Sequence, residues 1–311
     1  MSGSPLVSVI VPSYNSAGFV VAAVRSALNQ TYTNIEVIVV DDGSTDDTRA
    51  ILAEFGDSIR YIHQANQGLP GARNTAIRAA KGSVFAFLDA DDEWLPNKLA
   101  VQVPLLMQDE RVALVHSDVT FLDVESGNRY QQYQPRERFQ GNCYQALLFG
   151  NNVTPSTVIA RASAVREAGD FDSSLVTGCE DHDLWLRLAR HHSFAYTAEP
   201  LTVYRLHASN MTRNHLRMGQ ASLKVTRKAL GADPKLRAAI GARRVDHHVA
   251  DLEGSVGYLL LQSRQFRQAR EHLWRGVRLD PRAIHLWRFW ISSMLPDSFR
   301  RGFARLRNST P

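Results

Sequence analysis

Carboxylates crowd behind one apolar run of the sequence. The segment FLDADDEWLP places Asp89, Asp91 and Asp92 directly after the apolar residues 84–88. Three carboxylates this close repel one another unless solvent, a basic partner or a cation offsets their charge. Mg²⁺ and Mn²⁺ bind carboxylate oxygens together with the phosphates of a substrate, so a divalent metal on a diphosphate would satisfy such a site. Acidic residues after a strand also serve as turn and helix-cap residues, and the residue types alone leave that alternative open.

Two further acidic groups occupy comparable positions. Asp41 and Asp42 follow an apolar run in VIVVDDGSTDDT, and Glu180, Asp181 and Asp183 precede helically spaced apolar residues in GCEDHDLWLRL. Acidic residues in the first turn of a helix oppose its dipole and cap its N–H groups. A carboxylate in the same place is also able to take a proton from a hydroxyl group. Both interpretations of the second group stay open at this point.

Alternating strands and helices must position these groups. Strands are predicted over residues 6–11, 35–40, 60–63 and 84–88, and helices over residues 19–28, 50–55, 70–81 and 94–107. The strands are almost continuously apolar, which is typical of parallel strands covered on both faces. The alternation predicts an α/β fold with a Rossmann-like, mostly parallel, doubly wound sheet. Ligands bind beyond the carboxyl ends of such strands, so we expect the acidic groups behind the second and fourth strands to face one crevice.

Five motifs follow one another in a specific order. They are VSVIVPSYN, VIVVDDGSTDDT, NQGLPGARNTAIRAAKG leading into FLDADDEWLP, GCEDHDLWLRL and YRLHASNMT. With them the chain resembles the family 2 glycosyltransferases, inverting enzymes with the GT-A fold, over roughly residues 6–210. The resemblance implies that Pro12, Tyr14, Asn15 and Asp42 bind the nucleotide of a sugar nucleotide.

The same resemblance implies roles around the diphosphate. Asp89 and Asp91 would form the family's DxD pair that binds Mn²⁺ or Mg²⁺, with His207 near the metal or the diphosphate. Asp181 would be the base that accepts the proton of the acceptor hydroxyl, and Glu180 would support it or orient the acceptor.

Two other side chains lie close to these motifs. Arg73, at the start of the helix predicted over residues 70–81, suits the diphosphate of the donor, and it equally suits a solvated or ion-paired surface position. Asp92 is left outside the metal set, because we expect it to cap the helix predicted over residues 94–107.

The resemblance implies an enzyme of the hexosyltransferase class. Its expected reaction is transfer of a single sugar from a nucleotide-diphosphate donor, a UDP-sugar, to a hydroxyl of a glycan or lipid-linked acceptor in cell-surface polysaccharide synthesis. The chain has neither the QxxRW motif of processive synthases nor the GxGxR start of sugar-1-phosphate nucleotidyltransferases. The alternative is a non-catalytic sugar-nucleotide-binding or membrane scaffold protein that retains the fold.

Charge divides the chain into two predicted domains. Residues 1–212 contain 16 basic and 24 acidic residues, whereas residues 213–311 contain 20 basic and 7 acidic residues. We therefore expect a GT-A domain over 1–212 and a basic, α-helical C-terminal appendage over 213–311. Within the appendage, Gly257, Ala269 and Pro281 fit a single tetratricopeptide-like unit.

The end of the appendage mixes aromatic and basic residues. Trp287, Phe289, Trp290, Phe299 and Phe303 alternate with arginines in HLWRFWISSMLPDSFRRGFARLRNST. This composition favours an anionic membrane surface, with plain packing as the alternative and no nucleic acid partner expected. No apolar run is long enough to span a membrane, and the two cysteines lack metal-type spacing. We expect a cytoplasmic protein that attaches peripherally to the inner face of the plasma membrane.

Overall fold

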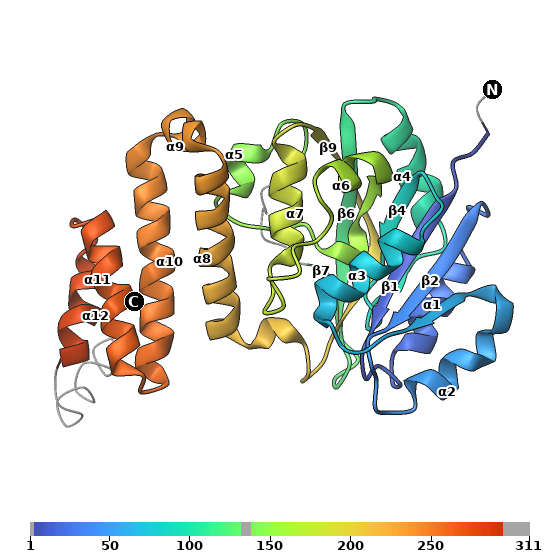
Figure 1. Ribbon diagram of the computed structural model, residues 1–311, viewed down its shortest axis with the longest axis horizontal. Helices are drawn as coiled ribbons and strands as arrows, with labels where there is room; N and C mark the ends of the chain where they lie inside the picture. Colours follow the sequence, from blue (N-terminus) through green and yellow to red (C-terminus); the bar gives the residue numbers. More distant parts are fainter. Residues whose placement is uncertain (1–2, 132–137, 295–311) are drawn as a thin grey trace. The chain divides into compact units, whose positions relative to one another are not determined.

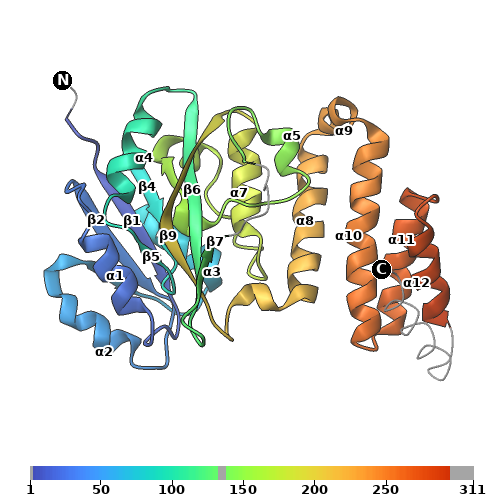
Figure 2. The same cartoon turned by 180° about the vertical axis from the view of Figure 1, so that it is seen from behind.

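The computed structural model describes residues 3–131 and 138–294, and the chain forms two compact units. The first unit comprises Met1–Val176 and Glu180–Asn210, and the second comprises Thr177–Cys179 and the chain from Met211 onward. Figures 1 and 2 show the first unit in blue to yellow and the helices of the second mainly in orange and red. All the residues to which the sequence assigns a site role lie in the first unit.

One sheet runs through the first unit. Its parallel part has the order β3-β2-β1-β4, formed by β1 (Val7–Ser13), β2 (Ile35–Asp41), β3 (Arg60–His63) and β4 (Val84–Phe87). The order continues through β8 (Ile159–Arg161), β6 (Val112–Asp123), β9 (Ser193–Leu206) and β5 (Glu93–Trp94), while β7 (Arg129–Gln131) pairs with β6. β8 is antiparallel to β4 and β6, whereas β6 and β9 are parallel. The carboxyl ends of β1, β2 and β4 therefore share one edge of the sheet.

Helices cover both faces of this sheet. They are α1 (Val20–Leu28), α2 (Thr48–Leu52), α3 (Gly68–Ala79), α4 (Lys98–Met107), α5 (Tyr144–Leu147), α6 (Ala162–Glu167) and α7 (Glu180–Ala189), with short 3₁₀ turns η1 (Ala53–Ser58) and η2 (Pro155–Thr157). On one face Val9 of β1 and Ala86 of β4 belong to a core that α1 and α4 complete. Because successive strand residues point to opposite faces, Phe87 lies on the other face, where its ring meets Phe171 and Trp185 of α7. Burial on both faces explains why β1, β2 and β4 are almost continuously apolar, whereas β3 at the edge of the sheet exposes Arg60 and His63.

The structure confirms the predicted α/β fold with its mostly parallel sheet and C-terminal helices. One predicted boundary was wrong, since the helix expected over residues 94–107 begins at Lys98. Glu93 and Trp94 instead form β5, which pairs with Val203 and Thr202 of β9. That partner strand lies more than a hundred residues further along the chain, so the local pattern gave no sign of the pairing.

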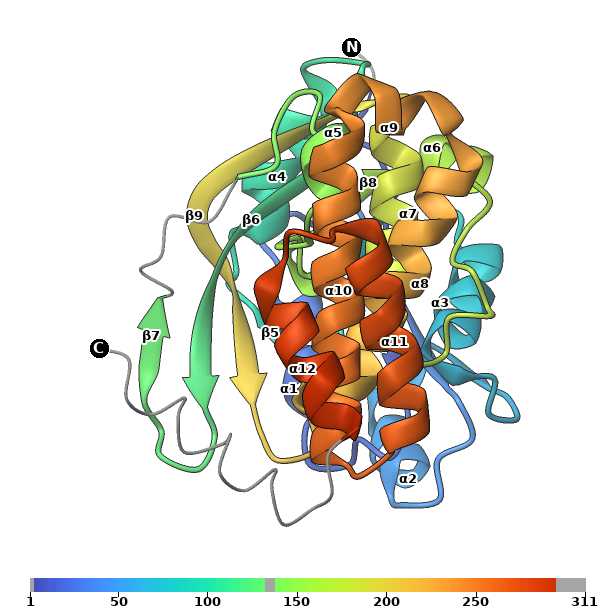
Figure 3. The same ribbon diagram turned by 90° about the vertical axis from the view of Figure 1, so that its left-hand side faces the viewer.

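The second unit is helical. It contains η3 (Met211–Arg213), α8 (His215–Ala232), α9 (Pro234–Ile240), α10 (Ala242–Gln262), α11 (Phe266–Leu279) and α12 (Ile284–Met294). Figure 3 shows α10, α11 and α12 side by side. A Cβ on Gly257 would lie 2.6 Å from Leu273, so this glycine allows α10 and α11 to approach closely.

No helix in the described parts of the chain combines the length and apolar character needed to cross a bilayer. Of the aromatic residues expected to meet a membrane, Trp287, Phe289 and Trp290 lie on α12. Phe299 and Phe303 lie outside the described residues, as do the arginines that follow Met294.

Candidate active site

The loop after β1 carries two of the predicted nucleotide-binding residues. Pro12 is buried within the strand, whereas the Tyr14 side chain is 52% exposed. Asn15 has a φ of 48°, a left-handed conformation that asparagine adopts more readily than most residues. Its Oδ1 accepts a hydrogen bond from the Thr45 N–H at 2.8 Å, and its own N–H donates to Ser44 Oγ at 2.9 Å. Asn15 thereby joins the loops after β1 and β2.

The two aspartates after β2 differ in their surroundings. Burial disfavours the charge of Asp41, but hydrogen bonds from Ser44 and Tyr61 outweigh it, so the pKa of the Asp41 carboxyl is lowered. Asp42 accepts hydrogen bonds at a single oxygen from Gln64 Nε2 at 2.7 Å and from the Gln67 N–H at 2.9 Å. Asp41 therefore stabilises the edge of the sheet through its hydrogen bonds to Ser44 and Tyr61. Asp42 stabilises the loop that leads into α3.

The acidic group after β4 meets a histidine from the end of β9. Asp91 Oδ2 lies 3.0 Å from His207 Nε2, and the ring of Phe19 stacks on the His207 ring with centroids 4.6 Å apart. Burial, followed by the nearby charge of Asp89, raises the pKa of the Asp91 carboxyl. The fold thus brings His207 to Asp91 from a segment more than a hundred residues away, and Asp89 lies close enough for its charge to act on Asp91.

Asp92 does not cap a helix, and that expectation was wrong. Its carboxylate is buried and accepts a hydrogen bond from the Arg205 N–H at 3.2 Å. The Arg205 side chain in turn donates from Nε to the Asp91 carbonyl oxygen and pairs with Glu93 at 3.0 Å. No role for Arg205 was predicted from the sequence, although Arg205 stands two residues before His207 in the motif YRLH.

Arg73 joins the acidic group after β4 to the start of α7. Its Nη2 lies 2.6 Å from Asp89 Oδ1, and its Nη1 lies 2.5 Å from Glu180 Oε1. The side chain is 1% exposed, which excludes the solvated surface position left open by the sequence. Burial opposes the charge of Arg73, but Asp89 and Glu180 outweigh it and raise the pKa of the guanidinium. Arg73 lies inside α3, one turn beyond its first residue.

Asp181 lies next to this ion-pair network in the first turn of α7. It is half-buried, and burial raises the pKa of its carboxyl although Arg73 and the amide of Asn151 act in the opposite direction. Asn151 Nδ2 donates to Asp181 Oδ2 at 2.9 Å. No role for Asn151 was predicted from the sequence. The only local feature that marks it is a pair of polar residues, Asn151 and Asn152, in the segment LLFGNNVTP.

The possible metal ligands of this site suit a hard divalent cation whose remaining coordination positions are filled by phosphate and water. Asp89 and Asp91 supply carboxylate oxygens, and His207 supplies an imidazole nitrogen beside Asp91. Within residues 3–131 and 138–294, no three such side chains are already arranged around a common point for an ion. Mg²⁺ and Mn²⁺ at phosphate sites need only one or two carboxylates from the protein, so the residues fit this role.

Comparisons with known proteins identify the family of the chain. The family described as Glycosyl transferase family 2 matches residues 8–166. An uncharacterized glycosyltransferase of Rickettsia prowazekii (strain Madrid E) is 36% identical over 217 residues, which is 68% of each chain. The Escherichia coli UDP-Glc:alpha-D-GlcNAc-diphosphoundecaprenol beta-1,3-glucosyltransferase WfaP is 35% identical over 212 residues, covering 67% of this chain and 80% of the relative.

Solved structures show the same fold at low sequence identity. TarS 1–349 of S. aureus in complex with UDP-GlcNAc has a TM-score of 0.66 at 16% identity, covering 95% of this chain and 92% of that chain. The mannosyltransferase PcManGT from Pyrobaculum calidifontis, in complex with GDP-Man and Mn²⁺, has a TM-score of 0.60 at 18% identity, covering 94% and 88%. The chain therefore belongs to glycosyl transferase family 2, and it is a glycosyltransferase with a GT-A type fold.

Proposed function

We propose that the protein is an inverting, metal-dependent hexosyltransferase that moves one sugar from a UDP-sugar to a hydroxyl of a glycan or lipid-linked acceptor. The observation that carries this proposal is the buried Arg73, which ties Asp89 of the DxD pair to Glu180 beside Asp181. This ion-pair network links the proposed metal-binding residue Asp89 to Glu180, the neighbour of the proposed base, and that link supports the proposal. The E. coli relative is named as a glucosyltransferase from UDP-glucose to GlcNAc-diphosphoundecaprenol, and this supports a role in cell-surface polysaccharide synthesis.

The residues after β1 and β2 would bind the nucleotide. The exposed ring of Tyr14 is available to contact the base, and Pro12 and Asn15 shape the loop that carries it. Asp42 keeps one carboxylate oxygen outside its two hydrogen bonds to the α3 loop, and that oxygen suits a ribose hydroxyl. These positions form one edge of the crevice, at the carboxyl ends of β1 and β2.

Asp89, Asp91 and His207 would hold Mn²⁺ or Mg²⁺ at the donor diphosphate. When bound there, the ion supplies Lewis-acid stabilisation of the negative charge on the leaving UDP. Arg73 adds a permanent positive charge behind Asp89, where burial strengthens its electrostatic effect. Both contributions favour departure of the nucleotide diphosphate.

Asp181 would accept the proton of the acceptor hydroxyl. Its raised pKa strengthens it as a base, and Asn151 orients the carboxylate by holding one of its oxygens. Glu180 is buried and paired with Arg73, and through this pair it would hold the start of α7 beside the proposed metal-binding loop after β4. The hydroxyl becomes acidic as its bond to the sugar forms, so a carboxylate is a sufficient base.

UDP release from a panel of UDP-sugars, with and without Mn²⁺, tests the proposal. We expect release that EDTA abolishes, and loss of that release in Asp91→Ala with the fold intact by circular dichroism. Asp181→Asn should still bind UDP with Mn²⁺ but lose about 10²-fold to 10⁴-fold in turnover, the usual contribution of a general base. Unchanged turnover of Asp181→Asn would move the base to another residue, and an active Asp91→Ala would remove the metal assignment.

We also propose that the sequence-based division into residues 1–212 and 213–311 describes two domains with separate tasks. The first carries the reaction. The second, with its tetratricopeptide-like helix pair of α10 and α11, attaches the enzyme peripherally to the cytoplasmic face of the membrane that holds the acceptor. Flotation of the full chain with vesicles, measured apart from UDP release, separates these two tasks.

A further inference from the structure

Three tryptophans of the second unit lie against one another. Trp274 of α11 and Trp290 of α12 have ring centroids 5.1 Å apart, and Trp287 lies 6.2 Å from Trp274 and 5.9 Å from Trp290. We call these residues the tryptophan cluster. The Trp274 side chain is 42% exposed, and on α12 Ile291 and Met294 are 50% and 51% exposed. The cluster therefore belongs to a partly exposed apolar surface of α11 and α12, and such surfaces are typical of interaction sites.

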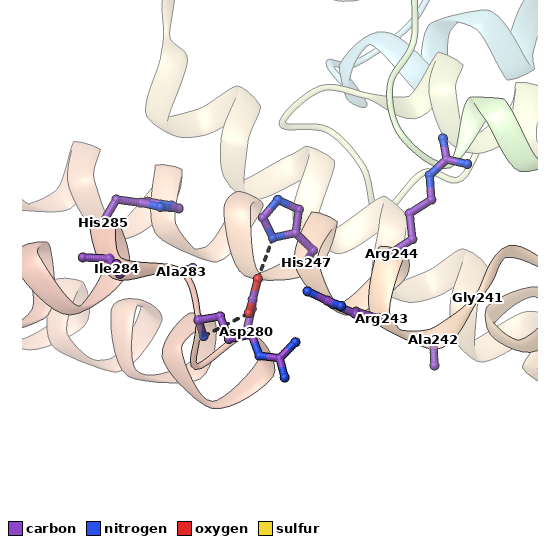
Figure 4. A pocket seen from close by; sticks show the side chains of 10 residues that line it. Gly241, Ala242, Arg243, Arg244, His247, Asp280, Ala283, Ile284 and His285 are labelled. Atoms are coloured by element: carbon purple, nitrogen blue, oxygen red, sulfur yellow. Dashed lines mark hydrogen bonds and ion pairs between the residues drawn. The ribbon is translucent and has the colours of Figure 1, made fainter.

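A basic pocket lies where the start of α10 meets the turn between α11 and α12. It is a cavity of about 930 Å³, and its lining includes Arg243, His247, Asp280, Arg282, Ile284 and His285. Figure 4 shows His247 and Arg243 extending toward Asp280. The Asp280 carboxylate already accepts hydrogen bonds from His247 Nδ1 at 2.6 Å and from the Arg282 N–H at 3.1 Å.

The charge of the pocket remains positive after these contacts. Within the described residues, neither the Arg243 nor the Arg282 guanidinium forms an ion pair with a carboxylate. The hydrogen bond to Asp280 raises the pKa of His247, which favours its protonated form. His247 also lies 3.4 Å from Asp251, so its imidazole is paired with two carboxylates. The guanidinium groups of Arg243 and Arg282 carry the remaining positive charge, which suits a phosphate group.

The tryptophan cluster and the basic pocket share one turn of the chain. Trp287 Nε1 donates a hydrogen bond to the carbonyl oxygen of Pro281 at 3.0 Å, and Arg282 and Ile284 of the same turn line the pocket. Ile284 is 72% exposed, so an apolar side chain stands at the pocket itself. Residues 264–294 contain seven arginines, no lysine and two acidic residues.

We propose that this turn docks on an anionic phospholipid bilayer, with the tryptophan cluster in the headgroup region and a headgroup phosphate in the basic pocket. Tryptophan rings favour the membrane–water interface, and arginines nearby are attracted to anionic lipids. A second copy of the chain fits less well, because two strongly basic surfaces repel each other. The inference deepens the membrane attachment proposed for the second unit, on which it rests, and is independent of the catalytic assignments.

Tryptophan fluorescence reports directly on the proposed contact. The chain has five tryptophans, and the two outside the cluster, Trp94 and Trp185, are 4% and 0% exposed. Vesicles of phosphatidylglycerol and phosphatidylcholine with brominated acyl chains should therefore quench only the cluster. We expect quenching and flotation that weaken with added salt, and neither with phosphatidylcholine alone. Flotation without quenching would contradict insertion of the cluster.

Two double variants distinguish phosphate binding in the pocket from general attraction between a basic surface and anionic lipids. Arg243→Gln with Arg282→Gln removes two charges from the pocket, and we expect about a thirtyfold loss of partitioning into anionic vesicles. Arg267→Gln with Arg275→Gln removes two charges from exposed arginines that face Glu271, and we expect a loss several times smaller. Equal losses in the two variants would overturn the phosphate pocket.

Trp274→Ser tests the apolar half of the surface without opening the core. It should lower vesicle binding about tenfold or more, whereas UDP release in solution stays as in the unaltered enzyme. Three results would overturn the proposal: no binding to anionic vesicles by the unaltered chain, binding of inorganic phosphate at the pocket with no vesicle binding, or a concentration-dependent dimer in sedimentation that Trp274→Ser abolishes. None of them bears on UDP release, so a failed membrane proposal leaves the proposed reaction intact.

Discussion

Asn151 is one of the groups that lower the proton affinity of Asp181, through one hydrogen bond. Its Nδ2 donates to Asp181 at 2.9 Å, while its Oδ1 is held by the Val153 N–H at 2.9 Å, so the orientation of the amide is fixed. The bond lowers the pKa of Asp181, against burial, which raises it. A base acts only when deprotonated, so the rate falls as the pH drops through that raised pKa. Asn151→Ala should therefore move the acid limb of the pH profile of kcat/KM for UDP release to higher pH.

The neighbouring amide provides the matched control for this prediction. Asn152 is exposed and, in the part of the chain that the structure describes, forms no hydrogen bond with Asp181, so Asn152→Ala should leave the acid limb in place. An unshifted profile in Asn151→Ala would show that a different group titrates in the rate. A uniform loss of rate at every pH would indicate a structural role for Asn151 in its loop.

Arg73 neutralises the buried carboxylate of Glu180 and the partly buried carboxylate of Asp89. Glu180 is 6% exposed at its side chain, and its pKa is raised by burial although the charge of Arg73 acts to lower it. Arg73→Met leaves Glu180 and Asp89 without their partner, and breaking a buried pair costs about 3–5 kcal/mol. Urea unfolding measures this loss. Arg111→Met, at an arginine whose side chain is 84% exposed, should leave the midpoint unchanged; a similarly small effect of Arg73→Met would show that water compensates the carboxylates.

At the scale of elements, the sequence predicted what depends on local pattern. The strands at 6–11, 35–40, 60–63 and 84–88 lie within a residue or two of β1 to β4, because buried parallel strands are apolar on both faces. The local pattern did not predict contacts between distant segments, although the family resemblance predicted that His207 lies near Asp91. Arg73 and Glu180 are 107 residues apart, and Asp92 and the Arg205 N–H are 113 residues apart. Periodicity carries no information about such pairs, which is why Asp92 was misread as a helix cap and Arg205 and Asn151 were missed.

The connection between α3 and β4 depends on a glycine. A Cβ at Gly82 would lie 2.6 Å from the Leu6 carbonyl oxygen and 2.8 Å from the Ser8 N–H nitrogen, both backbone atoms at the start of β1. Gly82→Ala must push β1 and this connection apart, and overpacking of this kind costs about 1–3 kcal/mol. Gly18→Ala, with open space around the added methyl group, is the control. Equal unfolding midpoints for the two variants would show that the edge of the sheet yields without loss.

At the scale of the whole molecule, charge and chemistry divide between the two units. The proposed nucleotide, metal and base residues all belong to the first unit, whereas the tryptophan cluster and the basic pocket belong to the second. The acidic excess before residue 213 and the basic excess after it follow the same division. An acidic first segment repels anionic lipids, so the basic second segment is the one suited to meet a bilayer.

Nucleotide binding should stabilise the first unit selectively. A ligand that binds only the folded state at a hundred times its Kd adds about 2.7 kcal/mol, which corresponds to about 5–10 °C for a unit of this size. We expect UDP with Mn²⁺ to raise one calorimetric transition by this amount and to leave the transition of the second unit in place. EDTA should remove the metal-dependent part of the shift, and Asp91→Ala should lack that part from the start. If both transitions rise together, the nucleotide site is not confined to the first unit; if Asp91→Ala keeps the full shift, the ion is held by other residues.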